Sequence, residues 1–315
     1  MACTPQADNS GSDVLLINPA AGAGRAVKVL PSLRKFAQEQ CWRVEFLVTQ
    51  SADDLIAKAR RAVAEGHRRI FVLGGDGTFQ VLLNALSDCP DVVLGVIPAG
   101  GGNDLAAALG LPPDPLRAAA LLLRGETSRM DAVRVRTADG RVWLYTGGGG
   151  VGLDAEASRH ASGSFRNLPG RLRYLLSAIR ALLDFQPVRA RISEQPGEPH
   201  SLTVTALLVG VLNTPSYGAG LYLAPDAQID DGHLNLVILE RLSILEIMLL
   251  LPALWSQGKL NTTRLQRFHV NCVRIETETP CNFHGDGEIL GMTPVEISVV
   301  PGAFCIVRPT RSPRP

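Results

Sequence analysis

The residues best suited to chemistry form the stretch Gly74-Gly-Asp-Gly-Thr78, which directly follows the apolar run Ile70–Leu73. Glycine has no Cβ, so a ligand can approach its backbone closely. Where such a loop leads from a strand into a helix, its N–H groups can bind an anion. Asp76, placed among these donors, suits a phosphate that carries Mg²⁺, or a substrate hydroxyl. A tight turn capped by Asp and Thr is the alternative interpretation.

Two other loops have a similar composition and also follow apolar runs. They are Asn18-Pro-Ala-Ala-Gly22 and Pro98-Ala-Gly-Gly-Gly-Asn-Asp104. In the second, Asn103 can hydrogen-bond a nucleotide, and Asp104 is expected to cap the helix that follows. The first loop lacks the Gly-Lys-Ser/Thr of a P-loop and the spacing of a dinucleotide-binding motif. Together the three loops predict a cradle for the phosphates of a nucleotide.

Two acidic clusters in the second half of the chain are further candidates. The adjacent carboxylates of Asp230 and Asp231 repel each other, which favours a divalent ion between them. In Gly285-Asp-Gly-Glu288, a loop between strands can present Glu288 as a base toward a hydroxyl. Each cluster taken alone is more often an ordinary turn.

These residues are positioned by an alternation of strands and helices in the first part of the chain. Strands are expected at 13–17, 42–49, 70–73 and 92–97, and helices at 26–39, 52–65, 79–86, 105–110 and 116–124. This order predicts a doubly wound parallel sheet that binds ligands at the carboxyl ends of its strands.

The second part of the chain has mainly strand patterns separated by Gly and Pro turns. Strands are expected at 130–136, 141–147, 188–193, 201–212, 233–239, 266–276 and 295–300, with helices at 168–185 and 242–255. This pattern predicts a sandwich-like β domain with inserted helices.

Composition narrows the class of protein. The 315 residues are 46% hydrophobic, and the net charge of +1 gives no strong field for nucleic acid. The longest apolar run, Leu242–Trp255, is too short to span a bilayer. The N-terminus is polar and lacks a signal-peptide core, so we expect a cytoplasmic protein. The six cysteines have no metal-binding spacing.

The three loops, in this order and at these separations, resemble the diacylglycerol kinase catalytic domain. So do the stretch from Tyr217 through Asp230-Asp-Gly-His-Leu234 and Gly285-Asp-Gly-Glu288. The resemblance covers roughly 14–307 and is closest to the soluble bacterial lipid kinases, a group that includes sphingosine kinase and phosphatidylglycerol kinase relatives.

The resemblance implies a two-domain fold, α/β plus mainly β. A three-layer α/β domain like that of NAD kinase would occupy 12–130, with 302–315 packing back on it. A β-sandwich-like lipid-substrate domain with inserted helices would occupy 131–301. ATP would lie in the cleft between them.

The resemblance also implies roles for individual residues. Glu288 would be the catalytic base, and Asp76 would act on Mg²⁺ or orient the hydroxyl. A structural divalent ion would involve Asp231, with Gln228 and His233 contributing backbone carbonyls. The implied nucleotide-binding residues are Asn18, Pro19, Ala20, Ala21, Gly22, Thr49, Gly74, Gly75, Asp76, Gly77, Thr78, Gly101 and Asn103.

This chain departs from the family pattern at two places. Gly101 stands where the family usually has Thr, so one hydroxyl contact to the nucleotide is missing. Phe79-Gln80-Val81 replaces the usual Leu-Asn-Glu. Gln80 can still hydrogen-bond, whereas Val81 cannot replace a carboxylate.

The expected activity is an ATP- and Mg²⁺-dependent transfer of phosphate to the hydroxyl of diacylglycerol or a related lipid alcohol, during transient contact with a membrane surface. A sphingoid-base or phosphatidylglycerol kinase remains open. So do a kinase of a soluble hydroxyl compound, in the manner of NAD kinase, and a nucleotide-binding regulator without catalysis. The assembly, including a homodimer, is also open.

Overall fold

The computed structural model describes most of the chain as two compact units. The described residues are 12–152, 187–194, 201–218, 220–242, 246 and 264–310. Unit 1 comprises residues 1–130 and 302–315, and unit 2 comprises residues 131–301. The helices expected at 168–185 and 242–255 lie outside the described residues, apart from residues 242 and 246. Within the described part of the chain, no helix is long and apolar enough to cross a membrane.

Unit 1 contains a parallel sheet with the strand order β2-β1-β3-β4-β15. Its strands are β1 (Asp13–Ile17), β2 (Val44–Val48), β3 (Arg69–Gly74), β4 (Val93–Pro98) and the end of β15 (Val295–Arg308). The apolar runs that predicted β1 and β3 are buried throughout, as a sheet covered on both faces requires.

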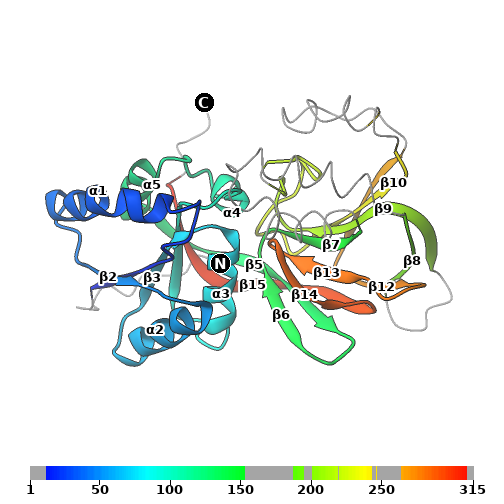
Figure 1. Cartoon of the computed structure of the whole chain (residues 1–315), viewed down its shortest axis with the longest axis horizontal. Helices are drawn as coiled ribbons and strands as arrows, with labels where there is room; N and C mark the ends of the chain where they lie inside the picture. Colours follow the sequence, from blue (N-terminus) through cyan, green and yellow to red (C-terminus); the bar gives the residue numbers. More distant parts are fainter. Residues whose placement is uncertain are drawn as a thin grey trace. The chain divides into compact units, whose positions relative to one another are not determined.

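Helices cover both faces of this sheet, which gives unit 1 three layers. Helix α1 (Arg25–Glu39) packs with α5 (Pro115–Leu123), and α2 (Ala52–Ala64) packs with α3 (Asp76–Ala85). Figure 1 shows these two pairs on opposite faces of the parallel strands. The short helix α4 (Asp104–Ala108) follows β4.

Helix α3 begins three residues earlier than the sequence pattern indicates. The pattern predicts a start at Phe79, but Asp76, Gly77 and Thr78 already form the first turn. A first turn tolerates glycine and favours an acidic residue, because its N–H groups have no partner within the helix. The glycine-rich motif is therefore half loop and half helix.

Unit 2 is built from antiparallel strands. They are β5 (Glu126–Thr137), β6 (Val142–Tyr145), β7 (Gly148–Gly152), β8 (Val188–Ser193), β9 (Leu202–Leu212), β10 (Leu234–Glu240), β11 (Leu265–Val270), β12 (Cys272–Thr277), β13 (Asn282–Gly285) and β14 (Glu288–Met292), together with the start of β15.

Three expectations for unit 2 need correction. The strand expected at 266–276 is two strands, β11 and β12, which separate at Asn271. The strand expected at 295–300 continues to Arg308. No strand was expected between 277 and 294, but β13 and β14 lie there, and the acidic motif around Asp286 is the turn between them.

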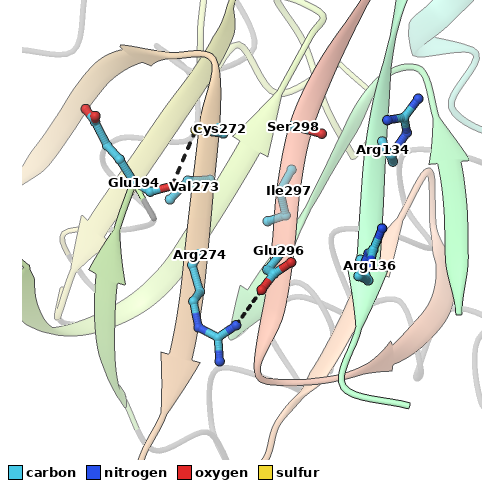
Figure 2. Close-up of a pocket in the computed structure, with 9 residues that line it drawn as sticks. All are labelled: Arg134, Arg136, Glu194, Cys272, Val273, Arg274, Glu296, Ile297 and Ser298. Atoms are coloured by element: carbon cyan, nitrogen blue, oxygen red, sulfur yellow. Dashed lines mark hydrogen bonds and ion pairs between the residues drawn. The ribbon is translucent and has the colours of Figure 1, made fainter. Parts of the chain in front are cut away.

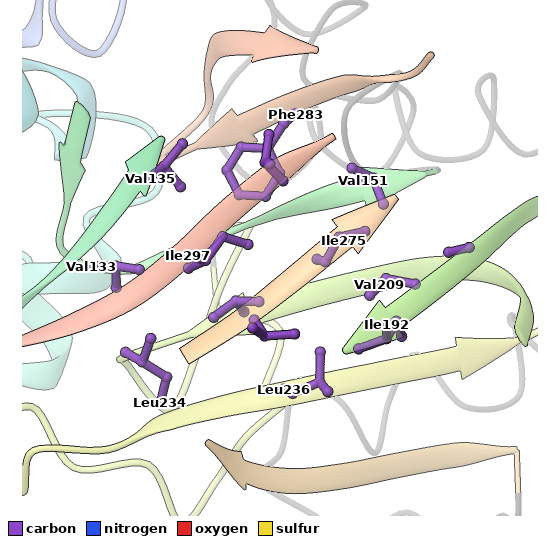
Figure 3. Close-up of a cluster of buried hydrophobic side chains, with 14 of the residues drawn as sticks. Val133, Val135, Val151, Ile192, Val209, Leu234, Leu236, Ile275, Phe283 and Ile297 are labelled. Carbon is purple, nitrogen blue, oxygen red and sulfur yellow. The ribbon is translucent and has the colours of Figure 1, made fainter. Parts of the chain in front are cut away.

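The core of unit 2 follows from the alternation of side chains along its strands. In β9, Val209 and Val211 face one hydrophobic cluster, which Figure 3 shows between the strands, whereas Leu208 and Leu212 face a second cluster. Neighbouring β10 alternates in the same way, as the period of two in a strand requires. Apolar side chains on both faces make β9 and β10 the buried centre of the unit.

Candidate functional site

The three glycine-rich loops of unit 1 meet at the carboxyl ends of β1, β3 and β4. A Cβ on Gly22 would lie 2.1 Å from the carbonyl oxygen of Ala99, and a Cβ on Gly100 would lie 2.5 Å from the Cα of Gly75. Such distances are too short for a side chain, so glycine is required where the loops touch. The first and third loops are thus in contact, and so are the second and third.

A side chain of the first loop also binds the second. The amide Nδ2 of Asn18 donates to Thr78 Oγ1 at 2.9 Å, and its Oδ1 accepts the N–H of Ala20 at 3.1 Å. The backbone of Ala20 and Gly22 remains at the surface, since both residues are exposed. Asn18 therefore holds two loops together while the main chain of its loop stays accessible.

The helices that leave these loops differ from the others in their N-caps. Ser51 caps α2 by accepting the N–H of Asp54, and Asp114 caps α5 by accepting the N–H of Arg117. In contrast, the N-cap residues of α1 and α3 are Gly24 and Gly75, which have no side chain to act as a cap. A helix N-terminus without a side-chain cap can bind a phosphate, although in α1 the N–H groups of Arg25 and Ala26 already donate to the carbonyls of Gly22 and Ala21.

Asp76 caps the neighbouring helix α4. Its Oδ2 accepts the N–H groups of Asn103 at 2.8 Å and Asp104 at 3.2 Å, and its Oδ1 accepts that of Leu105 at 3.0 Å. The expectation that Asp104 caps this helix was wrong, because Asp104 is already its first residue and the cap comes from Asp76. Burial raises the pKa of Asp76, while the three N–H donors act to lower it.

The hydrogen bonds of Asp76 support a structural role: they fix the third loop to the second. A role toward Mg²⁺ or a hydroxyl remains a prediction.

Asn103 and Thr49 also make internal contacts. The side chain of Asn103 closes its own loop, accepting the N–H of Gly100 at 2.8 Å and donating to its carbonyl at 3.0 Å. Thr49 is buried after β2, and its hydroxyl donates to the carbonyl of Ile17 at 2.9 Å. Gly101 lies within the half-buried third loop. Contact of these residues with a nucleotide stays a prediction.

In unit 2, Glu288 is the first residue of β14 and pairs with Gly285 across a two-residue turn. The turn residues, Asp286 and Gly287, have φ values of 50° and 89°, the left-handed conformation that suits a tight hairpin. Glu288 is exposed, yet partial desolvation by the surrounding protein raises the pKa of its carboxyl. A tight turn thus presents to solvent a carboxylate with the altered affinity for protons that suits a general base.

Asp286 anchors this hairpin and is a residue whose importance the sequence did not reveal. Its Oδ2 accepts from the N–H and hydroxyl of Thr146 at 2.8 and 3.0 Å, and its Oδ1 accepts the N–H groups of Gly147 at 2.8 Å and Gly148 at 3.2 Å. A carboxylate with four donors is strongly held. The orientation of Glu288 therefore depends on the residue two positions before it.

The glycine run before and within β7 is the surface against which this turn packs. A Cβ on Gly147 would lie 2.8 Å from Asp286 Oδ1, and one on Gly149 would lie 2.5 Å from the carbonyl of His284. A Cβ on Gly148 would meet the ring of Tyr217 at 2.7 Å. Consecutive glycines in a strand are the sequence signal that could have indicated this close approach.

The region proposed for a structural ion forms a turn with exposed Gln228, Asp231 and His233. Asp231 Oδ1 accepts the N–H of His233 at 2.9 Å, and Asp131 Oδ2 accepts the N–H of Gly232 at 2.7 Å. Among the described residues, no group of three or more His, Cys, Asp or Glu side chains is arranged to hold a metal. These side chains do not form a preformed carboxylate cage, and an ion bound through Asp231 and the backbone carbonyls of Gln228 and His233 stays a prediction.

Comparison with known proteins identifies the family. Residues 13–135 match the diacylglycerol kinase catalytic domain, and residues 147–308 match the YegS C-terminal NAD kinase beta sandwich-like domain. A diacylglycerol kinase of Mycobacterium tuberculosis strain H37Rv is 31% identical over 95% of this chain and 96% of its own length. The chain belongs to the diacylglycerol kinase family.

A further relative agrees with this family assignment, and a solved structure agrees with the fold. A probable lipid kinase, YegS-like, of Chromohalobacter salexigens is 29% identical and covers 84% of both chains. A solved structure of a diacylglycerol kinase from Bacillus anthracis covers 94% of this chain and 96% of its own, with a TM-score of 0.69 at 20% identity. The expected family and two-domain fold, with a C-terminal β-sandwich domain, are confirmed.

The contact between the first and third loops can be tested at Gly22. We expect Gly22→Ala to lower the free energy of unfolding by about 3 kcal/mol, because it combines left-handed backbone strain with a clash. Gly24→Ala is the matched control, since Gly24 also has a positive φ but a Cβ added there would have no atom within 4 Å. It should cost only about 1 kcal/mol. Equal costs in urea denaturation of the two variants would contradict the assigned contact.

The anchor of the unit 2 hairpin can be tested with Asp286→Asn. An amide has one acceptor oxygen, and its NH₂ group would face N–H donors, so we expect a loss of about 2 to 3 kcal/mol in unfolding free energy. Asp139→Asn provides the control, because Asp139 also precedes a turn glycine but is exposed. It should cost less than about 1 kcal/mol. A similar change in both denaturation midpoints would refute the anchoring role.

Proposed function

We propose that this protein transfers the γ-phosphate of ATP to the hydroxyl of diacylglycerol or a related lipid alcohol. The observation that carries the proposal is the convergence of three glycine-rich loops on two helix N-termini without side-chain caps. Main-chain donors and helix dipoles together favour a polyphosphate. Membership of a kinase family makes ATP the natural nucleotide.

Nucleotide binding is proposed to depend on main-chain N–H groups of unit 1. Those of Gly22 and of Gly74 to Thr78 would bind the phosphates. The N–H groups of Ala20 and Ala21 already donate to Asn18, which together with Asp76 keeps the loops in place. Mg²⁺ carried by ATP would offset the charge of the phosphates. Because main-chain groups bind the phosphates and side chains hold the loops, few side chains would contact the phosphates directly.

Glu288 is proposed to act as the general base. As the lipid oxygen bonds to the γ-phosphorus, Glu288 takes the hydroxyl proton, and the bond from the γ-phosphorus to the bridging oxygen of ADP breaks. The raised pKa of Glu288 supports this role, because a more basic carboxylate is a better proton acceptor. The protein would bind the membrane surface only peripherally while it takes its substrate.

The lipid assay tests the reaction and its substrate class together. Purified protein with radiolabelled ATP, Mg²⁺ and mixed micelles should phosphorylate diacylglycerol in preference to phosphatidylglycerol, ceramide or a sphingoid base. NAD serves as the soluble alternative acceptor. Absence of any phosphorylated lipid would refute the proposal, and NADP formation would favour a soluble substrate instead.

The base is tested by Glu288→Gln, which keeps the shape of the side chain but cannot accept the proton. We expect turnover to fall by about 100-fold or more while the Kd for ATP is unchanged. Glu278→Gln is the control, because Glu278 is an exposed carboxylate of the same unit that pairs with Arg189. Equal turnover of Glu288→Gln and the wild type would exclude Glu288 as the base.

The pH profile adds a second readout of the same residue. Because the pKa of Glu288 is raised, its proton is retained to higher pH than on an ordinary glutamate, and the active carboxylate forms only above that point. The acid limb of kcat/KM should therefore lie above the value of about 4.3 typical of glutamate. An acid limb at or below that value would contradict the assignment.

A further inference from the structure

A pocket of about 250 Å³ lies in unit 2 along strands β5, β12 and β15. Val133 and Val135 of β5 are buried in the core cluster, so the alternate residues Arg134 and Arg136 point to the opposite face. Side chains of β12 and β15 complete the pocket, as Figure 2 shows.

The positive charges of this pocket are not equally neutralised. Arg274 of β12 donates from Nε to Glu276 at 2.9 Å and from Nη1 to Glu296 at 2.7 Å. Arg134 and Arg136 are exposed, and no ion pair or side-chain hydrogen bond joins either of them to the described part of the chain. A guanidinium stays charged at all relevant pH values. The two arginines therefore hold adjacent positive charges that no described residue neutralises.

The carboxylates of the pocket do not supply the missing partner. Glu296 is already bound by Arg274. Glu194 lies on the β8 side, across β12 and β15 from the two arginines, as Figure 2 shows. Arg134 and Arg136 lie two positions apart on the same face of β5, so an anion from outside the protein that binds both would offset the repulsion between their charges.

The neighbouring strand indicates where that anion comes from. In β6, Leu144 lies opposite Arg134, and Val142 lies opposite Arg136. Val142 is 49% exposed. Cationic groups beside an exposed apolar side chain suit the boundary between headgroups and acyl chains of a bilayer. Inorganic phosphate would match the arginines alone, whereas a phospholipid matches the arginines and Val142 together.

We propose that Arg134 and Arg136 bind the phosphate of an acidic phospholipid, and that this face of β5 and β6 docks on the membrane. Two parallel N–H donors of a guanidinium match two phosphate oxygens, which adds orientation to charge attraction. The docking surface rests on the proposed function only in that a lipid kinase must reach a bilayer. It is distinct from the loops of unit 1 and from Glu288.

Vesicle binding of the full-length protein, measured without ATP, tests the proposal independently of catalysis. The vesicles contain either phosphatidylcholine alone or equal parts of phosphatidylcholine and phosphatidylserine. We expect binding to the anionic vesicles, and an affinity about 30-fold weaker for the double variant Arg134→Ala/Arg136→Ala, since each arginine near the surface contributes a factor of about five.

The matched control is Arg189→Ala/Arg191→Ala. It also removes two exposed arginines at alternate positions of one strand of unit 2, but Arg189 pairs with Glu278, and Arg191 donates to Ser201. The control should bind anionic vesicles nearly as well as the wild type. An equal loss in both double variants would show general charge attraction and overturn the assigned site.

Two further measurements distinguish the other occupants. Calorimetric titration with inorganic phosphate should show weaker binding than the vesicles; equal affinity would indicate a free phosphate site and overturn the lipid assignment.

Sedimentation equilibrium should give the same mass for the wild type and Arg134→Ala/Arg136→Ala, whereas dissociation of a dimer in the variant would identify a protein interface instead. If the micelle assay fails but the vesicle results hold, the proposed reaction is refuted and the docking surface is not.

Discussion

The arrangement of the three glycine-rich loops of unit 1 depends on the carboxylate of Asp76. Three consecutive N–H groups at the start of α4 donate to it, although it belongs to the first turn of α3. Hydrogen bonds to a charged acceptor are strong, and they offset the cost of burying that charge. The backbone of the third loop is thereby tied to β3, and the close approach of Gly75 and Gly100 becomes the stable arrangement.

In unit 2, Asp286 likewise attaches a distant backbone segment through its carboxylate. Both aspartates stand between two glycines, and both accept N–H groups from a segment distant in sequence. In each case glycine removes the side chains that would obstruct the approach, and the aspartate provides the attachment. Aspartate in a glycine-rich motif is commonly interpreted as a ligand for metal or phosphate, but here its contacts first determine where the neighbouring backbone lies.

The sequence predicted the parts of the fold that local pattern determines. The buried apolar runs located β1, β3 and β4 to within about two residues. The start of α3 was missed because two glycines obscure a helical pattern, and the β13–β14 hairpin was missed because its residues do not alternate regularly. The cap of α4 by Asp76 joins residues 27 or more positions apart, so no local pattern could reveal it.

These contacts explain why the departure from the family pattern at Gly101 is compatible with the proposed chemistry. The side chains that shape the loops, Asn18, Asp76 and Asn103, are present and make their bonds to backbone or to Thr78. If main-chain N–H groups bind the phosphates, replacement of a threonine by Gly101 removes one hydroxyl and leaves those donors intact. Substitution at the loop surface should then alter affinity for the nucleotide, whereas substitution of the residues that hold the loops together should alter the fold of the site itself.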